Sequence, residues 1–186
     1  MSALSDKSVL ISIRPRWCEL IASGQKTIEV RKTAPKIKTP FRCYIYCTKE
    51  ERGVGEVPYR HFYQSPEGPK HFTGGTVIGE FICDRIYGIV PQENGYEYEF
   101  PYSGRDCLTE LELYNYLGDE VGLGWHISNL KIYDEPRPLT NFHRPCPNGL
   151  YCEGCGMYMQ RQHACGNSAL QIRRPPQSWM YVEDQT

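Results

Sequence analysis

Apolar and polar residues alternate along much of this chain with the period of β-strands. The strand-like stretches are short and rich in Val, Ile and Tyr, and they cover residues 8–13, 26–32, 42–48, 76–90, 125–133 and 178–183. Residues 42–48 are apolar at almost every position, which is typical of a central strand buried on both faces. Because the last stretch lies far along the chain from the first, we expect non-local closure of the sheet. The pattern predicts an α+β fold, a small β-barrel with short flanking helices.

Two short stretches have helical spacing instead. The first begins at Pro15, which suits the first turn of a helix, and ends at Gly24. The second begins with Thr109 and Glu112, which have the spacing of a capping box, and it ends at Gly118. The chain is therefore expected to contain more strand than helix.

Two further stretches interrupt the strand pattern. Residues 50–74 are rich in Gly, Pro and aromatic residues, and they predict a long loop inserted between strands. Residues 142–172 hold four of the nine cysteines among Gly and Pro residues, and they predict an excursion from the barrel. A length of 186 residues suits one domain, so we expect a single domain over residues 1–186 that carries both stretches.

Composition narrows the class of protein. With 40% hydrophobic and 23% charged residues, the chain is typical of a globular protein and not of a disordered one. No stretch reaches the roughly 18 consecutive apolar residues of a membrane span, and no secretory signal is visible in the first residues. These observations predict a cytoplasmic protein that has no contact with a membrane.

Charge is unevenly distributed, although the net charge is −1. Residues 1–60 hold 12 Lys and Arg against 6 Asp and Glu, whereas residues 61–120 hold 3 against 11. The basic N-terminal third favours contact with phosphate groups, and a mixed solvated surface is the ordinary alternative.

The stretch with the most distinctive chemistry runs from Gly24 to Arg31. Glu29 and Arg31 are two residues apart on a predicted strand, so they share a face and can form a pair. Lys26 is out of phase with them and must reach the same place from the turn after Gly24, where glycine permits an unusual backbone. Two cations and one carboxylate suit the oxygens of a nucleotide and the exocyclic amino group of a base. An exposed salt bridge on a strand face is the alternative.

The spacing of these four residues, G-x-K-x-x-E-x-R, resembles the signature of ASCH domains, which are PUA-like β-barrels related to RNA-binding modules. The context is similar too, because a strand and a helix that starts at proline precede the motif and a basic stretch follows it. Three other stretches resemble bacterial, phage and prophage-type members: Gly79–Phe81, Gly124–His126 and Arg174–Trp179. The resemblance covers most of residues 8–140 and the last strand.

The resemblance implies a cleft that binds RNA, a nucleotide or a modified nucleoside through Gly24, Lys26, Glu29 and Arg31. Some ASCH-like proteins instead remove the acetyl group of N4-acetylcytidine with a lysine, a threonine and a glutamate. Lys26 matches that lysine, whereas Glu29 stands at the position of the threonine and residues 103–108 lack the glutamate. For an enzyme, the resemblance implies an amidohydrolase or ribonuclease with Lys26 and Glu29 as catalytic groups. We place binding without chemistry ahead of catalysis.

Trp125 and His126 are two more candidates for the ligand site. Gly122 and Gly124 beside Trp125 would allow a ligand to approach closely, and the indole ring can stack on a base. His126 has the chemistry for proton transfer. Both residue types are more often structural, tryptophan in the core and histidine bonded to a neighbour.

A separate signal lies in the cysteine-rich stretch, where Cys146, Cys152, Cys155 and Cys165 fall within 20 residues. A Cys-x-x-Cys turn places two thiolates on one ion, and two more thiolates complete tetrahedral Zn²⁺. His163 is the alternative ligand. We expect one structural zinc, which would stabilise a segment with little core of its own. A redox pair and unliganded thiols are the alternatives.

The sequence leaves three functions open. The first is recognition of RNA or a nucleotide, and the second is hydrolysis of RNA or of a modified nucleoside. The third is a zinc-stabilised protein-interaction module, whose contacts with a protein partner would come from residues 50–74 and 142–172.

Overall fold

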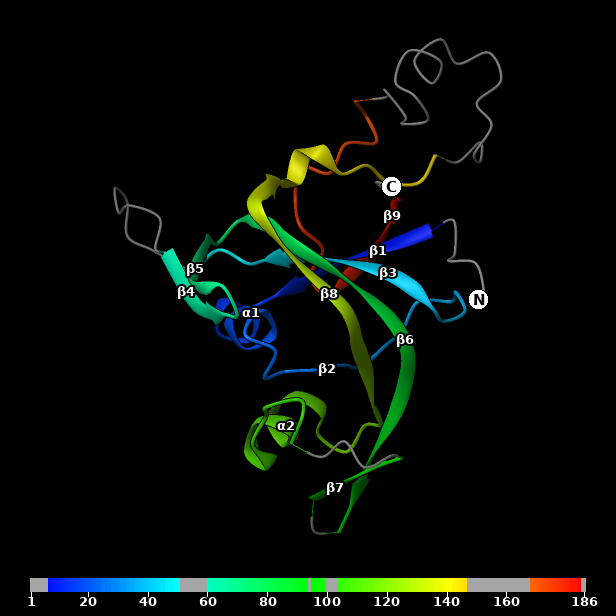
Figure 1. The fold of residues 1–186 in the computed structure, drawn as a ribbon. Coiled ribbons are helices and arrows are strands. Elements are labelled where there is room, and N and C mark those ends of the chain that lie inside the picture. Colours follow the sequence, from blue (N-terminus) through cyan, green and yellow to red (C-terminus); the bar gives the residue numbers. More distant parts are fainter. Residues whose placement is uncertain (1–6, 51–59, 94, 100–103, 147–167, 185–186) are drawn as a thin grey trace.

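The computed structural model describes residues 7–50, 60–93, 95–99, 104–146 and 168–184. It is built around one curved sheet of seven strands, with two helices and a separate two-stranded hairpin (Figure 1). In chain order the elements are β1 (Lys7–Ile13), α1 (Pro15–Ala22), β2 (Ile28–Arg31), β3 (Phe41–Cys47), β4 (Arg60–Ser65), β5 (Gly68–Thr73), β6 (Thr76–Gln92), β7 (Gly95–Tyr98), α2 (Glu110–Leu117), β8 (Gly122–Pro138), the short 3-10 helix η1 (Leu139–Asn141) and β9 (Trp179–Glu183). The α+β class expected from the sequence is confirmed.

The strands of the sheet follow the order β2-β8-β6-β3-β1-β9, and β7 pairs with the far end of β6. β1 and β3 run parallel, and the other neighbours are antiparallel. β9 joins β1 with Trp179 opposite Ile11, so the last strand does pair with the first strand described. The predicted long-range pairing of the last strand is therefore present, although β9 remains an edge of the sheet.

The sheet curls, but no ladder of backbone hydrogen bonds closes it into a barrel in the described residues. Side chains bridge the gap between the edge strand β2 and the β1–β9 edge, and we call this gap the seam. Arg31 on β2 donates to the carbonyl of Ser12 on β1 at 2.6 Å. Trp179 on β9 donates from Nε1 to the hydroxyl of Thr33, just after β2, at 3.1 Å. The expected barrel is thus open, because large polar side chains occupy the place of a ladder.

The two faces of the sheet bury different cores, because successive residues of β1 and β3 point to opposite sides. The inner core packs against α1, and its buried members include Val9, Ile11, Cys18, Ile21, Ile45 and Trp125. The outer core is covered by η1 and by the chain before β9, and it includes Leu10, Tyr44, Val77, Tyr133, Phe142 and Val182. The candidate site lies against the inner core.

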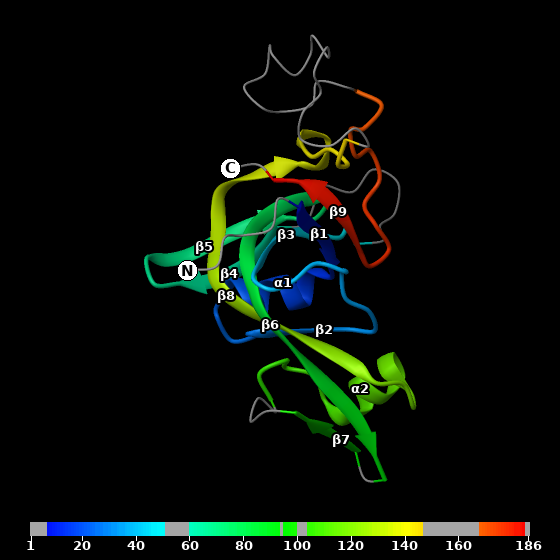
Figure 2. The ribbon, with the colours of Figure 1, turned by 90° about the vertical axis from the view of Figure 1, so that its right-hand side faces the viewer.

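β6 and β8 are 17 residues long and carry several bulges, which let the pair bend. Beyond the main sheet they extend to β7 and α2, which form a lobe at one end of the molecule (Figure 2). The capping box at the start of α2 is present, with the Thr109 and Glu112 side chains each bonded to the other residue's backbone. Neither helix in the described part of the chain is long and apolar enough to cross a membrane.

The two stretches that interrupt the strand pattern have different outcomes. Residues 60–73, expected as part of a loop, form the β4–β5 hairpin, because their side chains are alternately buried and exposed along β4. Within it, His61 lies 3.0 Å from Glu19 on α1. Residues 51–59 lie outside the described residues. The cysteine-rich stretch leaves and rejoins the fold at one place, where His143 pairs with Gln171.

Candidate functional site

The turn after α1 directs Lys26 into the protein. Gly24 has a φ of +77°, a value that side-chain-bearing residues rarely adopt, and its N–H donates to the carbonyl of Ile21 at 2.9 Å. The N–H of Lys26 then donates to the carbonyl of Leu20 at 2.9 Å. As a result the lysine side chain turns inward and is only 2% exposed.

Lys26, Glu29 and Arg31 form one buried set of charges, which we call the inner network. Glu29 lies between the two cations, with its carboxylate oxygens 3.4 Å from Lys26 Nζ and 2.9 Å from Arg31. Arg31 also donates to the carbonyl of Ser12 across the seam. Each of the three residues is less than one-tenth exposed. The pairing of Glu29 with Arg31 expected from the strand period is present.

Two backbone carbonyls complete the surroundings of Lys26. Its ammonium donates to Ile28 at 2.8 Å and to Asp106 at 2.6 Å. The carboxylate of Asp106 is used elsewhere, since it accepts from the Tyr98 phenol and from the N–H of Leu108. Burial, followed by this contact with Asp106, raises the pKa of Tyr98. The phenol therefore remains a neutral donor.

Among the described residues, three buried polar atoms of Thr27, Arg31 and Trp125 have no hydrogen-bond partner: Arg31 Nε, Trp125 Nε1 and Thr27 Oγ1. Buried polar groups in folded proteins are nearly always paired, so each such atom is unusual. Two of them are N–H donors, and they add to a set that already holds two cations and one carboxylate. This set of groups therefore suits a partner that carries acceptor oxygens and negative charge.

Aromatic rings line the same region. Trp125 stands opposite Glu29 in the β2–β8 ladder, so the two side chains lie on the same face of the sheet. The Trp125 ring lies 6.1 Å from that of Trp179, which is only partly buried at the seam. On the other side, Lys26 Nζ lies 5.3 Å from the centre of the Trp17 ring, within range of a cation–π contact.

The structure places His126 away from the inner network. His126 follows Trp125 on β8 and therefore points to the opposite face, beside Ile28. Its Nδ1 lies 2.6 Å from a carboxylate oxygen of Asp84. Of the two adjacent candidates, only Trp125 joins the site.

Gly122 and Gly124 make room for the protein's own side chains. A Cβ on Gly124 would lie 3.0 Å from Ile28 Cγ2, and a Cβ on Gly122 would lie 2.5 Å from Leu117 Cδ1. These glycines therefore serve the packing of β8 against β2 and α2. They do not open space for a ligand beside Trp125.

The cysteines that the structure describes differ in burial. Cys18, Cys43, Cys47 and Cys83 are buried, whereas Cys107 is half-buried, and burial raises the pKa of Cys18, Cys43 and Cys83. Of the expected zinc ligands, Cys146 is described, and Cys152, Cys155, His163 and Cys165 lie outside the described residues. In the part that is described, no three His, Cys, Asp or Glu residues are grouped to hold a metal.

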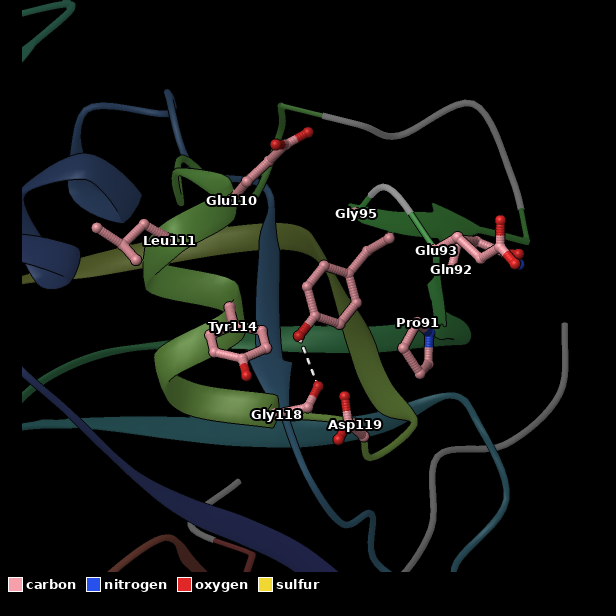
Figure 3. A pocket seen from close by; sticks show the side chains of 10 residues that line it. Pro91, Gln92, Glu93, Gly95, Glu110, Leu111, Tyr114, Gly118 and Asp119 are labelled. Atoms are coloured by element: carbon pink, nitrogen blue, oxygen red, sulfur yellow. Dashed lines mark hydrogen bonds between the residues drawn. The ribbon is translucent and has the colours of Figure 1, made fainter.

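Among the cavities in the described part of the structure, two lie at opposite ends of the molecule. The first, of about 420 Å³, opens between α2 and the β6–β7 hairpin, and we call it the acidic cavity (Figure 3). Glu93, Glu110 and Asp119 line it, together with Leu111 and Tyr114. Three carboxylates around one cavity repel phosphate groups, so the acidic cavity does not suit a nucleic-acid backbone.

The second cavity, of about 550 Å³, lies where β1 and β3 end, and we call it the basic cavity. Its charged lining residues are Lys49 and Arg173. Neither cavity is lined by Lys26, Glu29 or Arg31. These three residues are buried, and the side chains of Arg31 and Trp179 bridge the seam beside them.

Comparisons with known proteins support the fold. No protein-family model matches the sequence, and no curated protein matches it. The structure is similar to the crystal structure of ASCH from Zymomonas mobilis, with 20% identity, a TM-score of 0.55, and coverage of 95% of this chain and 88% of that one. A single-substitution variant of the same protein gives 20% identity and a TM-score of 0.53, and covers 96% of this chain and 90% of that one. The chain therefore has the fold of these ASCH structures.

Proposed function

We propose that the protein binds single-stranded RNA, or a nucleotide from it, at the seam between β2 and the β1–β9 edge. The observation that carries the proposal is the pair of unpartnered buried donors, Arg31 Nε and Trp125 Nε1, beside two buried cations. Phosphate and base carbonyl oxygens are acceptors of the kind this set lacks. The ASCH-domain fold is consistent with this function.

Each member of the site has a role that its chemistry suits. The planar guanidinium of Arg31 can present two parallel N–H groups to a phosphate or to a base edge. Glu29 can accept from an exocyclic amino group of a base. Trp179, partly exposed at the mouth of the seam, offers a face on which a base stacks.

Entry of a ligand requires only side-chain movement. Across the seam, the Arg31 side chain donates to the Ser12 carbonyl, and the Trp179 side chain donates to the Thr33 hydroxyl. The donor of each hydrogen bond is therefore a side chain. Rotation of these side chains opens the seam without breaking any strand ladder. A ligand phosphate would replace the Ser12 carbonyl as the acceptor for Arg31.

The geometry favours binding over catalysis by Lys26. A general base must direct a lone pair at its substrate. The Lys26 nitrogen instead donates to two backbone carbonyls and lies beside the Glu29 carboxylate, so its donors already have acceptors. Catalysis by Lys26, in an amidohydrolase or a ribonuclease, would first require these hydrogen bonds of Lys26 to break.

Fluorescence anisotropy of a labelled single-stranded RNA at low salt tests the proposal. Arg31→Lys keeps the charge but loses Nε and the fork, and we expect about tenfold weaker binding, which corresponds to about 1.4 kcal/mol. Arg42→Lys, the same change at a half-buried arginine on the outer face, is the matched control and should bind like wild type. Equal affinities for the two variants, with folding verified by circular dichroism, would contradict the proposal.

A further inference from the structure

The basic cavity has a lining that suits an oxyanion. Lys49 and Arg173 are both exposed, and no carboxylate side chain lines the cavity with them. Within the described part of the chain, neither cation is in an ion pair. Two unneutralised cations beside one cavity favour a ligand with concentrated negative charge, of which a phosphate group is the common case.

Hydroxyl groups add neutral donors to the same lining. Tyr46, Thr48 and Thr140, each of which carries a hydroxyl group, also line the basic cavity. Burial, followed by the nearby Cys47, raises the pKa of the Tyr46 phenol, so it stays protonated and able to donate. Cations combined with hydroxyl donors are the groups that proteins use against phosphate oxygens.

The turn before β6 holds Lys49 in place. Gly75 has a φ of +90°, and a Cβ at this position would lie 2.7 Å from Lys49 Cε and 3.0 Å from its Cγ. The lysine stem therefore lies across the space that any other residue at 75 would fill. This packing restricts the stem and brings the ammonium to the cavity, which lowers the entropy lost when an anion binds.

One short segment connects the basic cavity to the seam. Residues 173–179 run from the cavity to Trp179 and span at most about 20 Å when extended. Ser12 fixes this segment, because its hydroxyl donates to the Pro176 carbonyl at 2.7 Å and its N–H donates to the Ser178 carbonyl at 2.9 Å. The carbonyl of the same Ser12 accepts from Arg31.

We infer that the basic cavity is a second subsite, which holds a backbone phosphate of the same RNA strand whose base enters the seam. The inference rests on the proposed function, because the seam supplies the first contact. It assigns Lys49 and Arg173 to phosphate binding and predicts that the protein prefers an RNA strand long enough to reach both places.

Strand length separates the two subsites. We expect Lys49→Ala/Arg173→Ala to bind a labelled 12-nucleotide RNA about tenfold more weakly than wild type at low salt, and to bind a dinucleotide equally well. The slope of log affinity against log salt for the longer RNA should fall by about 0.7, the value for one phosphate on a single strand. Arg60→Ala/Lys131→Ala, which removes two exposed cations from β4 and β8, is the control of matched charge.

Pyrophosphate provides an arm that is independent of RNA. In ¹H–¹⁵N spectra, pyrophosphate should shift the amides of Thr48, Gly75 and Thr76 in wild type and in the control, and not in Lys49→Ala/Arg173→Ala. RNA binding that is sensitive to Arg31→Lys but unchanged in the double variant, without pyrophosphate shifts, overturns the subsite alone. Pyrophosphate shifts without any RNA binding overturn the proposed function and its extension to RNA, and leave only an anion site.

Discussion

Two clusters of charged side chains, one buried and one half-buried, lie on opposite faces of the same sheet, and they differ in their balance of cations and carboxylates. On the outer face, Arg42 lies 2.5 Å from Glu80 and 3.3 Å from Asp184. Each carboxylate also accepts a phenol, from Tyr133 at 2.5 Å and from Tyr44 at 2.9 Å. We call these five residues the outer network. It holds one cation and two carboxylates, and every carboxylate has two different donors.

The inner network has the opposite composition, with two cations around the single carboxylate of Glu29. In the described part of the chain, Arg31 Nε and Trp125 Nε1 have no hydrogen-bond partner. The outer network joins β3, β6 and β8 to the end of the chain described. Its Arg42 Nε also has no hydrogen-bond partner among the described residues, but it lies 3.3 Å from the carboxylate of Asp184. We therefore base the proposed binding site on the excess of cations in the inner network and on its place at an open edge of the sheet.

The largest expected effect is on stability, from the change Glu29→Gln. This substitution leaves two cations buried without a carboxylate, and we expect the free energy of unfolding to fall by about 3 kcal/mol. Glu80→Gln on the outer face should cost less, because Asp184 still neutralises Arg42. Urea unfolding at neutral pH measures both. An equal loss for the two variants would remove the distinction between the networks.

A smaller effect is expected at alkaline pH from Tyr133. Burial, followed by its bond to Glu80, raises the pKa of this phenol. A raised pKa in the folded state gives stability that is present below the unfolded value of about 10 and is lost as pH rises above it. Tyr133→Phe should therefore lose less stability than wild type between about pH 9 and pH 11. Urea unfolding across this range tests it, and parallel pH profiles would contradict it.

Tyr98, whose phenol binds Asp106 beside the inner network, contributes in the same direction. Alkaline loss of stability should therefore be reduced and not abolished in Tyr133→Phe. The double variant with Tyr98→Phe should show the flattest profile of the series.

Features that depend only on neighbouring residues were predictable from the sequence. Pro15 starts α1, and Thr109 with Glu112 caps α2, because each depends only on residues within one turn of the helix. The shared face of Glu29 and Arg31 follows from the period of a strand. These signals need no knowledge of distant parts of the chain.

The rest of the site depends on distant backbone groups that have no side-chain signature. The carbonyls of Ser12 and Asp106 receive Arg31 and Lys26, and any residue type at those positions could have supplied them. The hairpin at residues 60–73 was hidden by Gly and Pro residues that also occur in loops. Its strand character is visible only in the alternation of His61, Tyr63 and Ser65 as buried positions.

The indole N–H of Trp125 offers the most direct test that RNA completes the inner network. Its ¹⁵N-indole resonance is assigned by its loss in Trp125→Phe and followed as single-stranded RNA is added. The account predicts that this resonance shifts with the same saturation curve as RNA binding, and that the shift is greatly reduced in Arg31→Lys. Saturable RNA binding that leaves the Trp125 resonance unmoved would contradict it and would place the RNA elsewhere on the protein.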